Sequence, residues 1–295
     1  MFVLPFLSSP CGYSLQAYKS TCIEIPITVI DGFFSQKRVY RGSQEYNQQI
    51  KSYPGYNIKT ELQPFFDRIG IRQDIIVLER LNLGFCGAEG TNFFTKGDAV
   101  IWVAPKFHKV DKGACHWLMK HEACHIKNND CFTMPLIPAI CSIAAATFSA
   151  FMMPIIPALL ITMSVGFIAQ AIFSQYREGK ADDLAITESS VEELKGGRRL
   201  LMSLQQTNLE NRTTIWKKLV LSPNGENRLD FLHPSTASRL KKIERALQQK
   251  DVQIDEGEEI EKIVKLKNLM VEINLKIEKE LKELGIFGLM KAMQQ

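Results

Sequence analysis

The stretch "KHEACHIKNND" (residues 120–130) is followed at once by a segment without a charged residue, Cys131 to Tyr176. Within it, His121, Glu122 and His125 form the pattern H-E-x-x-H. Histidines four apart on a helix lie on the same side, one turn apart, so both rings can reach one ion. Zinc suits imidazole ligands, and a catalytic zinc keeps one coordination position open. The stretch therefore predicts a zinc-binding helix.

The predicted helix spans residues 112–130, with Asp111 as its N-cap. Ala114 and Leu118 share roughly one face with the two histidines. Glu122 lies beside the first ligand, where it can act as general base and later return the proton to a leaving amine. Cys124 occupies a position that the pattern leaves free and is interpreted as a small helix residue.

The uncharged segment contains two apolar runs, residues 136–153 and 156–173. Each is long enough, at about 1.5 Å per residue, to cross most of a hydrocarbon core about 30 Å thick. Pro154 and Pro157 lie between the runs, where a turn is needed. A buried helical hairpin in a soluble protein is the alternative. The length of the uncharged run favours a membrane hairpin.

A third ligand is expected beyond this hairpin. Glu178 and Asp182 are four residues apart in "YREGKADDLA", so Glu178 can bind the metal while Asp182 orients a ligand histidine, in this interpretation His121. Two surface carboxylates are the alternative. Two membrane crossings return the chain to the side that it left, so the paired runs and a shared ion agree with each other.

Basic residues flank both ends of the hairpin, among them Lys120, Lys127, Arg177 and Lys180, whereas the connection between the two runs is uncharged. Cytoplasmic flanks of membrane helices carry an excess of lysine and arginine. The sequence therefore predicts an integral membrane protein with the zinc-binding part on the cytosolic side.

The rest of the chain predicts a small sheet and further helices. β-branched runs indicate strands at residues 74–80 and 99–105, with a glycine-rich loop running into an edge strand between them. Other expected elements are a β-hairpin at 24–40, a short helix within 57–70 interrupted near Pro64, two helices after Arg177 broken at Gly196-Gly197, a helix after Pro234, and a charged helix over 256–285. The last helix has an apolar stripe of Ile260, Ile263, Val264, Leu266 and Leu269.

Composition restricts the class of protein. Apolar residues make up 45% and charged residues 23% of the 295 residues, which is ordinary for a folded chain. The net charge of +4 does not indicate a nucleic-acid partner. Seven scattered cysteines form no C-x-x-C pair, so a disulfide framework is not expected. The first apolar run is short and broken by Pro5, so no secretory signal is expected either.

H-E-A-C-H, a two-span insertion, E-x-x-A-D at 178–182 and then His233, Pro234 and Arg239 resemble the HtpX-like membrane zinc endopeptidases. The wider group includes the CAAX prenyl endopeptidase and the mitochondrial inner-membrane stress peptidase. The resemblance covers about residues 75–245 and implies a gluzincin-type α+β fold, with a two-helix transmembrane hairpin between the H-E-x-x-H helix and the third-ligand helix. It also implies endoproteolysis of membrane or unfolded proteins.

The resemblance assigns roles to named residues. His121, His125 and Glu178 would bind one zinc ion per subunit, Glu122 would be the base and Asp182 would orient a ligand. The segment 90–105 looks like the family's edge strand, on which Asn92 would contact substrate backbone. His233 is a possible hydrogen-bond donor to the oxyanion of the transition state.

These observations predict three regions: an N-terminal segment (1–73), a zinc peptidase domain (74–245, hairpin at about 134–174) and a C-terminal helical tail (246–295). The expected function is a membrane-anchored zinc endopeptidase that acts on protein or peptide substrates through zinc-activated water, with Glu122 as general base. Alternatives are a non-catalytic membrane adaptor with a structural metal site, or a protease that processes prenylated peptides. Structural zinc sites normally have four protein ligands, and only three candidates are found here.

Overall fold

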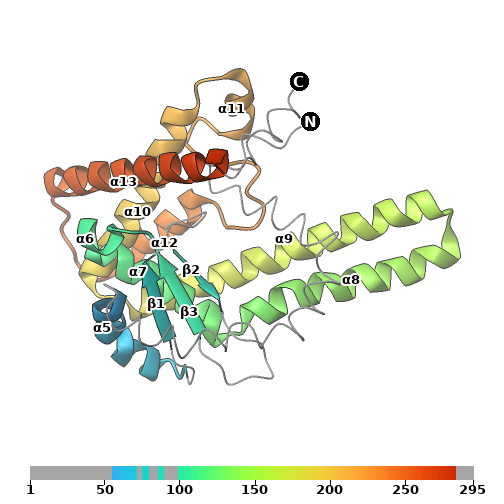
Figure 1. The fold of residues 1–295 in the computed structure, drawn as a ribbon, viewed down its shortest axis with the longest axis horizontal. Coiled ribbons are helices and arrows are strands. Elements are labelled where there is room, and N and C mark those ends of the chain that lie inside the picture. The colour runs from blue at the N-terminus through green and yellow to red at the C-terminus, as the bar shows by residue number, and fades with distance from the viewer. Residues whose placement is uncertain (1–54, 72–74, 80–85, 90–98, 284–295) are drawn as a thin grey trace.

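The computed structural model describes residues 55–71, 75–79, 86–89 and 99–283. Figure 1 shows a mostly helical body from which a two-helix hairpin projects, formed by α8 (Asp130–Met152) and α9 (Ile155–Glu188). The body contains α5 (Gly55–Arg68), β1 (Ile75–Glu79), β2 (Cys86–Glu89), β3 (Ala99–Val103), α6 (Phe107–Val110), α7 (Lys112–Lys127), α10 (Val191–Asn211), α11 (Ile215–Val220), α12 (Thr236–Gln249) and α13 (Glu256–Glu283). This agrees with an α+β fold dominated by helices.

The sheet has three described strands in the order β1-β3-β2. β3 pairs in parallel with β1, where Ile75 is opposite Ala99, and antiparallel with β2, where Cys86 is opposite Val103. The predicted strands at 74–80 and 99–105 are thus confirmed. The expectation that β3 belongs to an edge strand is wrong, because β1 covers its other side. Among the described strands, β1 and β2 are the edges.

Helix α7 begins at Lys112 with Asp111 as its N-cap, as predicted, but it ends at Lys127 and not at residue 130. The Asp111 side chain accepts a hydrogen bond from the Ala114 backbone at 2.9 Å, which satisfies one of the free N–H groups of the first turn. The buried Arg199 guanidinium of α10 donates to both Asp111 oxygens at 2.6 and 3.0 Å, and to Glu259 of α13 at 2.6 Å. One buried arginine therefore joins the start of α7 to two other helices.

Helix α10 packs against α7 at two glycines. A Cβ atom on Gly196 would lie 2.1 Å from the backbone nitrogen of Ala114, and one on Gly197 would lie 2.6 Å from the indole of Trp117. Both glycines are inside α10, so the predicted helix break at this pair is wrong. The absence of side chains here permits close approach of two helix backbones, and the helix tolerates the cost of about 1 kcal/mol per glycine.

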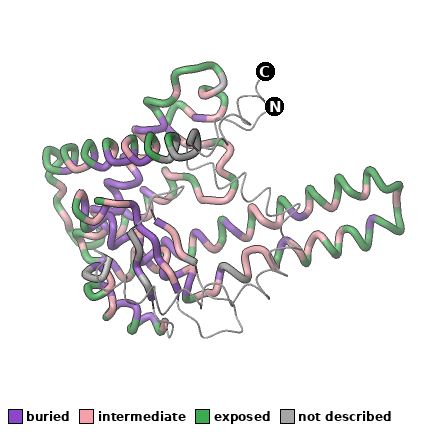
Figure 2. Tube along the Cα trace, in the orientation of Figure 1, coloured by how far each residue is buried: buried purple, intermediate pink, exposed green. Residues whose placement is uncertain are grey.

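The hairpin helices are long, apolar and exposed, as Figure 2 shows along most of their length. Phe151 is 84% exposed and Ile155 is 74% exposed, and only 11% of either apolar window is buried. The protein thus has two helices long and apolar enough to cross a membrane. A hairpin buried within a soluble body, the alternative from the sequence, is not what the structure contains.

Two short connections orient the hairpin. Asn129 links α7 to α8 in the left-handed conformation (φ 55°), which asparagine tolerates better than most residues. Met153 and Pro154 separate α8 from α9, near the predicted turn. α9 then continues for 34 residues, about 51 Å, without interruption. The helix expected to carry Glu178 is therefore the continuation of the second hairpin helix and not a separate element.

The C-terminal helices α12 and α13 confirm the predicted elements. Ile263, Leu266 and Leu269 are buried, but Ile260 and Val264 are 58% and 41% exposed. The predicted stripe was wrong for these two residues, which lie on another side of the helix. The buried stripe continues instead through the next two turns, at Met270 and Ile273.

Helix α5 runs through Pro64 without a break, so the predicted interruption is wrong. Leu62, Phe65 and Phe66 are each at most 4% exposed and belong to the same core as β1. Burial of these side chains offsets the local cost of proline in a helix. The predicted β-hairpin at 24–40 lies outside the described residues.

Candidate metal centre

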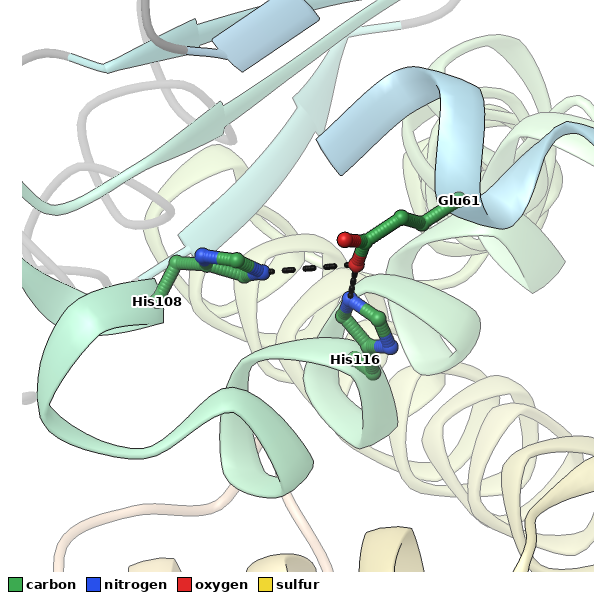
Figure 3. Close-up of side chains that lie close together, drawn as sticks. All are labelled: Glu61, His108 and His116. Carbon is green, nitrogen blue, oxygen red and sulfur yellow. Dashed lines mark ion pairs between the residues drawn. The ribbon is translucent and has the colours of Figure 1, made fainter. Parts of the chain in front are cut away.

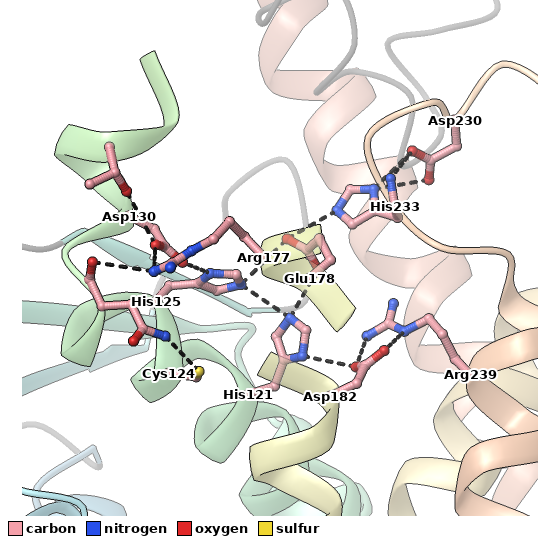
Figure 4. Close-up of polar contacts among 12 residues, drawn as sticks. His121, Cys124, His125, Asp130, Arg177, Glu178, Asp182, Asp230, His233 and Arg239 are labelled. Carbon is pink, nitrogen blue, oxygen red and sulfur yellow. Dashed lines mark hydrogen bonds and ion pairs between the residues drawn. The ribbon is translucent and has the colours of Figure 1, made fainter. Parts of the chain in front are cut away.

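His121 and His125 project from one side of α7, and α9 brings Glu178 to the same point (Figure 4). The two histidine Nε2 atoms are 3.3 Å apart. Glu178 Oε2 lies 3.1 Å from Nε2 of His121, and Oε1 lies 3.4 Å from Nε2 of His125. These three residues, called here the α7–α9 cluster, are the ones that the sequence predicted to meet across the hairpin.

The spacing of the α7–α9 cluster fits a metal ion. A tetrahedral zinc with bonds of about 2.0–2.2 Å keeps its ligand atoms roughly 3.3–3.6 Å apart. The two Nε2 atoms have this separation at 3.3 Å, and one Glu178 oxygen lies 3.1 Å from the first and the other oxygen 3.4 Å from the second, so the carboxylate needs only a local shift to match the arrangement. Two imidazole nitrogens and one carboxylate also form a donor set that zinc favours. The cluster could therefore hold one ion and leave a coordination position open.

The outer nitrogen of His121 contacts a carboxylate. Its Nδ1 atom lies 3.0 Å from Asp182 Oδ1, the contact expected from the sequence. Arg239 of α12 donates to both Asp182 oxygens, at 2.8 and 2.7 Å. This bidentate pair holds the carboxylate, and the carboxylate fixes the ring so that Nε2 faces the ion site.

His125 has an equivalent partner that the sequence interpretation missed. Its Nδ1 atom lies 2.7 Å from Asp130 Oδ2 at the start of α8, and Arg177 of α9 forms an ion pair with the same carboxylate. Arg177 also donates to the backbone carbonyl of Asn128 at 3.2 Å. A signal was present: Asp130 ends the quoted stretch, five residues after His125. Both ligand rings are thus oriented by carboxylates that arginines hold in turn.

Electrostatics favours positive charge in this cluster. Burial alone would lower the pKa of His121, but Asp182 and Glu178 outweigh it, and the pKa is raised. Burial likewise opposes protonation of His125, yet Asp130 and Glu178 raise its pKa well above the usual value. The carboxylates that stabilise an imidazolium would also stabilise a bound cation.

Glu122, the predicted base, is partly exposed and lies on α7 beside the cluster. Its charge acts on two neighbours: it contributes to the raised pKa of His125, and after burial it is the main cause of the raised pKa of the Cys86 thiol on β2. Among the described residues, no side chain forms an ion pair or hydrogen bond with Glu122. Its charge therefore lies close to both His125 and Cys86 of β2.

His233 and Asn92 were the two other predicted site residues. His233 Nε2 lies 3.8 Å from Glu178 Oε1, while Nδ1 faces the Asp230 carboxylate at 2.8 and 3.0 Å. Burial opposes protonation, but Glu178 and Asp230 raise the pKa of His233. The structure thus places this histidine at the rim of the cluster. Asn92 lies outside the described residues.

Comparisons with protein-family models, with curated proteins and with solved structures found no match to this chain. A functional assignment therefore has to come from the chemistry of the α7–α9 cluster and from the hairpin beside it.

Proposed function

We propose that this protein is a membrane-anchored zinc endopeptidase with a gluzincin-type active site, similar to the HtpX-like enzymes. The observation that carries the proposal is the α7–α9 cluster, in which residues from both sides of the hairpin converge within 3.4 Å of one another. Three protein ligands suit a catalytic zinc site with an open position better than a closed structural site. A partly exposed carboxylate, Glu122, follows His121 directly on α7.

Zinc bound by the three ligands would polarise a substrate carbonyl and lower the pKa of water. In the proposed reaction, the Glu122 carboxylate accepts a proton from the attacking water and returns it to the departing amine nitrogen. Asp182 and Asp130 keep the His121 and His125 rings aimed at the ion. His233, at the rim, donates a hydrogen bond to the carbonyl oxygen as negative charge develops there.

The proposed substrate strand runs along β2. This strand lies beside α7 and pairs with β3 through Cys86 and Glu89, which leaves its second side without a partner among the described strands. Extended peptides bind sheet edges through backbone hydrogen bonds, which suits an enzyme that accepts unfolded segments of many sequences. Beyond burial, the charge of Glu122 raises the pKa of the Cys86 thiol on β2, so Glu122 lies near this strand. A peptide bound along β2 would therefore pass close to the proposed base.

The proposed membrane arrangement places α8 and the apolar part of α9 in the bilayer and the body in the cytosol. The uncharged connection at Met153 and Pro154 then lies on the far side. Lys127, Arg177 and Lys180 lie at the body end of the hairpin, where the positive-inside tendency expects them. This position suits cleavage of membrane proteins and of unfolded chains near the membrane surface.

The test compares membranes that contain the wild type with membranes that contain Glu122→Gln. Removal of a general base is expected to slow cleavage by roughly 10²–10⁴-fold while zinc content is unchanged, because Glu122 is not a ligand. Cleaved proteins are identified from new N-termini by mass spectrometry. Glu261→Gln is the matched control, since Glu261 is 67% exposed on α13, away from the cluster.

If Glu122→Gln cleaves at the wild-type rate, the assigned mechanism is wrong. If neither protein cleaves anything but both retain zinc, the adaptor with a structural metal site replaces the enzyme as the best interpretation.

A further inference from the structure

A second group of metal-binding side chains lies on the opposite end of α7. Glu61 of α5, His108 of α6 and His116 of α7 point toward one another, as Figure 3 shows, and their ligand atoms all lie within 4.8 Å of one another. This group is called here the α5–α7 cluster. Its members come from three separate elements and belong to no motif recognised in the sequence.

Both histidines face a single carboxylate oxygen. Glu61 Oε2 lies 3.0 Å from Nε2 of His116 and 3.6 Å from Nε2 of His108, and the two ring centroids are 5.4 Å apart. Within the described part of the chain, both Nε2 atoms are buried and neither makes a hydrogen bond of acceptable geometry. Two buried ring nitrogens that point at one carboxylate oxygen without a well-formed hydrogen bond to it make a donor set that a shared cation would complete.

The donor set indicates the class of ligand. Two imidazole nitrogens and one carboxylate suit zinc and similar transition metals, whereas calcium and magnesium prefer oxygen donors only. Glu193 Oε1 lies 3.5 Å from Nδ1 of His116, so it could accept the Nδ1 proton when Nε2 binds a metal ion.

One residue opposes metal binding at this cluster. Lys112 Nζ lies 2.9 Å from both oxygens of Glu61 and provides positive charge where an ion would add its own. The Lys112 side chain is 57% exposed, so it can move into solvent when the Glu61 carboxylate binds a metal ion. A metal ion and the lysine ammonium therefore compete for the same carboxylate.

We propose that Glu61, His108 and His116 form a second, reversible site for zinc or a related transition-metal ion, which clamps α5 against α7 and displaces Lys112. The bound ion would connect α5 directly to α6 and α7. Without the ion, α5 packs mainly against strand β1 of the sheet. This proposal is independent of peptidase activity, because it uses none of the residues of the α7–α9 cluster.

The test is a zinc titration of the full-length protein in detergent against a chromophoric chelator, after dialysis to remove metal. The wild type is expected to bind two ions, and His108→Gln is expected to bind one while it keeps the ion held by Glu178. Lys112→Met is expected to tighten the weaker site by up to about fivefold, since it removes an exposed ion pair that competes with metal. Lys109→Met is the matched control, because Lys109 is an exposed lysine on neighbouring α6.

A single bound ion in the wild type that is lost in Glu178→Gln and unchanged in His108→Gln overturns the proposal. So does a Lys112→Met protein whose weaker site is unchanged, because a purely structural ion pair predicts no gain. Conversely, one ion that survives Glu178→Gln and disappears in His108→Gln supports the second site and removes the peptidase proposal. Folding of each variant is checked by the thermal unfolding temperature, and Lys112→Met removes no ligand, so the test does not depend on His108 alone.

Discussion

The two clusters of two histidines and one glutamate differ in what stands behind each ligand. In the α7–α9 cluster, both rings are held by carboxylates, Asp182 and Asp130, and each of these is paired with an arginine. In the α5–α7 cluster, His116 has a carboxylate behind it, at 3.5 Å, and none stands behind His108 among the described residues. The ligand atoms are also more evenly spaced in the first cluster than in the second.

This difference separates a preorganised ion site from an adjustable one. Glu178 is 8% exposed and faces three histidines, His121, His125 and His233, whereas the Glu61 side chain is 36% exposed and also pairs with Lys112. A site whose ligands are already oriented loses little freedom when the ion binds, so it binds more tightly. We therefore expect the α7–α9 cluster to retain its ion through purification and the α5–α7 cluster to exchange its ion readily.

The largest expected effect comes from disturbing the contact between α7 and α10, because α7 carries ligands of both clusters. Gly196→Ala would place a methyl group 2.1 Å from the backbone of α7, and neither helix backbone can yield easily. The expected loss is about 3 kcal/mol or more in the free energy of unfolding, and metal binding at both clusters should weaken. Denaturant unfolding and zinc titration measure these quantities.

Gly179→Ala is the control for Gly196→Ala. Gly179 lies inside α9, and an added Cβ would meet nothing within 4 Å. Alanine there should stabilise the helix by about 0.5–1 kcal/mol. Equal effects of the two substitutions would show that α7 and α10 do not pack as closely as described.

The next effect separates the two clusters. Glu178→Gln removes the only carboxylate among the ligands of the α7–α9 cluster and should weaken zinc binding there by at least about 100-fold, more than loss of an outer partner. The α5–α7 cluster should titrate as in the wild type. Zinc content after gel filtration measures the first effect. Unchanged zinc retention would remove Glu178 from the ligand set.

The smallest effect tests the outer carboxylates. Asp130→Asn and Asp182→Asn keep the shape of each side chain but weaken its hold on the ligand ring, and each should lower zinc affinity about 10–100-fold. Asp183→Asn is the control, since Asp183 is 60% exposed and pairs with Lys242 on the surface. Competition with a chelator gives the affinities. If Asp130→Asn binds zinc like the wild type, the comparison between the clusters loses its physical basis.

Local spacing explains what the sequence could predict. The separation of four residues that brings His121 and His125 together is a property of any helix, and so is the N-cap at Asp111. The uncharged run predicted the hairpin, and two crossings required Glu178 to return to the same side. Each of these inferences depends on residues close together in the sequence or on the number of apolar runs long enough to cross a membrane.

The parts that were missed depend on packing between distant segments. Glu61 meets His116 only because α5 packs beside the sheet, and no spacing in the sequence records that contact. Gly196 and Gly197 looked like a helix break because glycine is more often found at breaks than at close helix contacts. The central place of β3 follows from its parallel pairing with β1, which is also non-local.

The uninterrupted course of α9 has a consequence for how the protein sits in its surroundings. One helix carries exposed apolar residues in its first half and Glu178 in its second half, so a change in its rotation would move both together. A single residue inserted between Phe173 and Glu178 would turn the carboxylate by about 100° and shift it by about 1.5 Å relative to the apolar half. An insertion on the far side of the apolar half, at Met153–Pro154, would leave this relation unchanged.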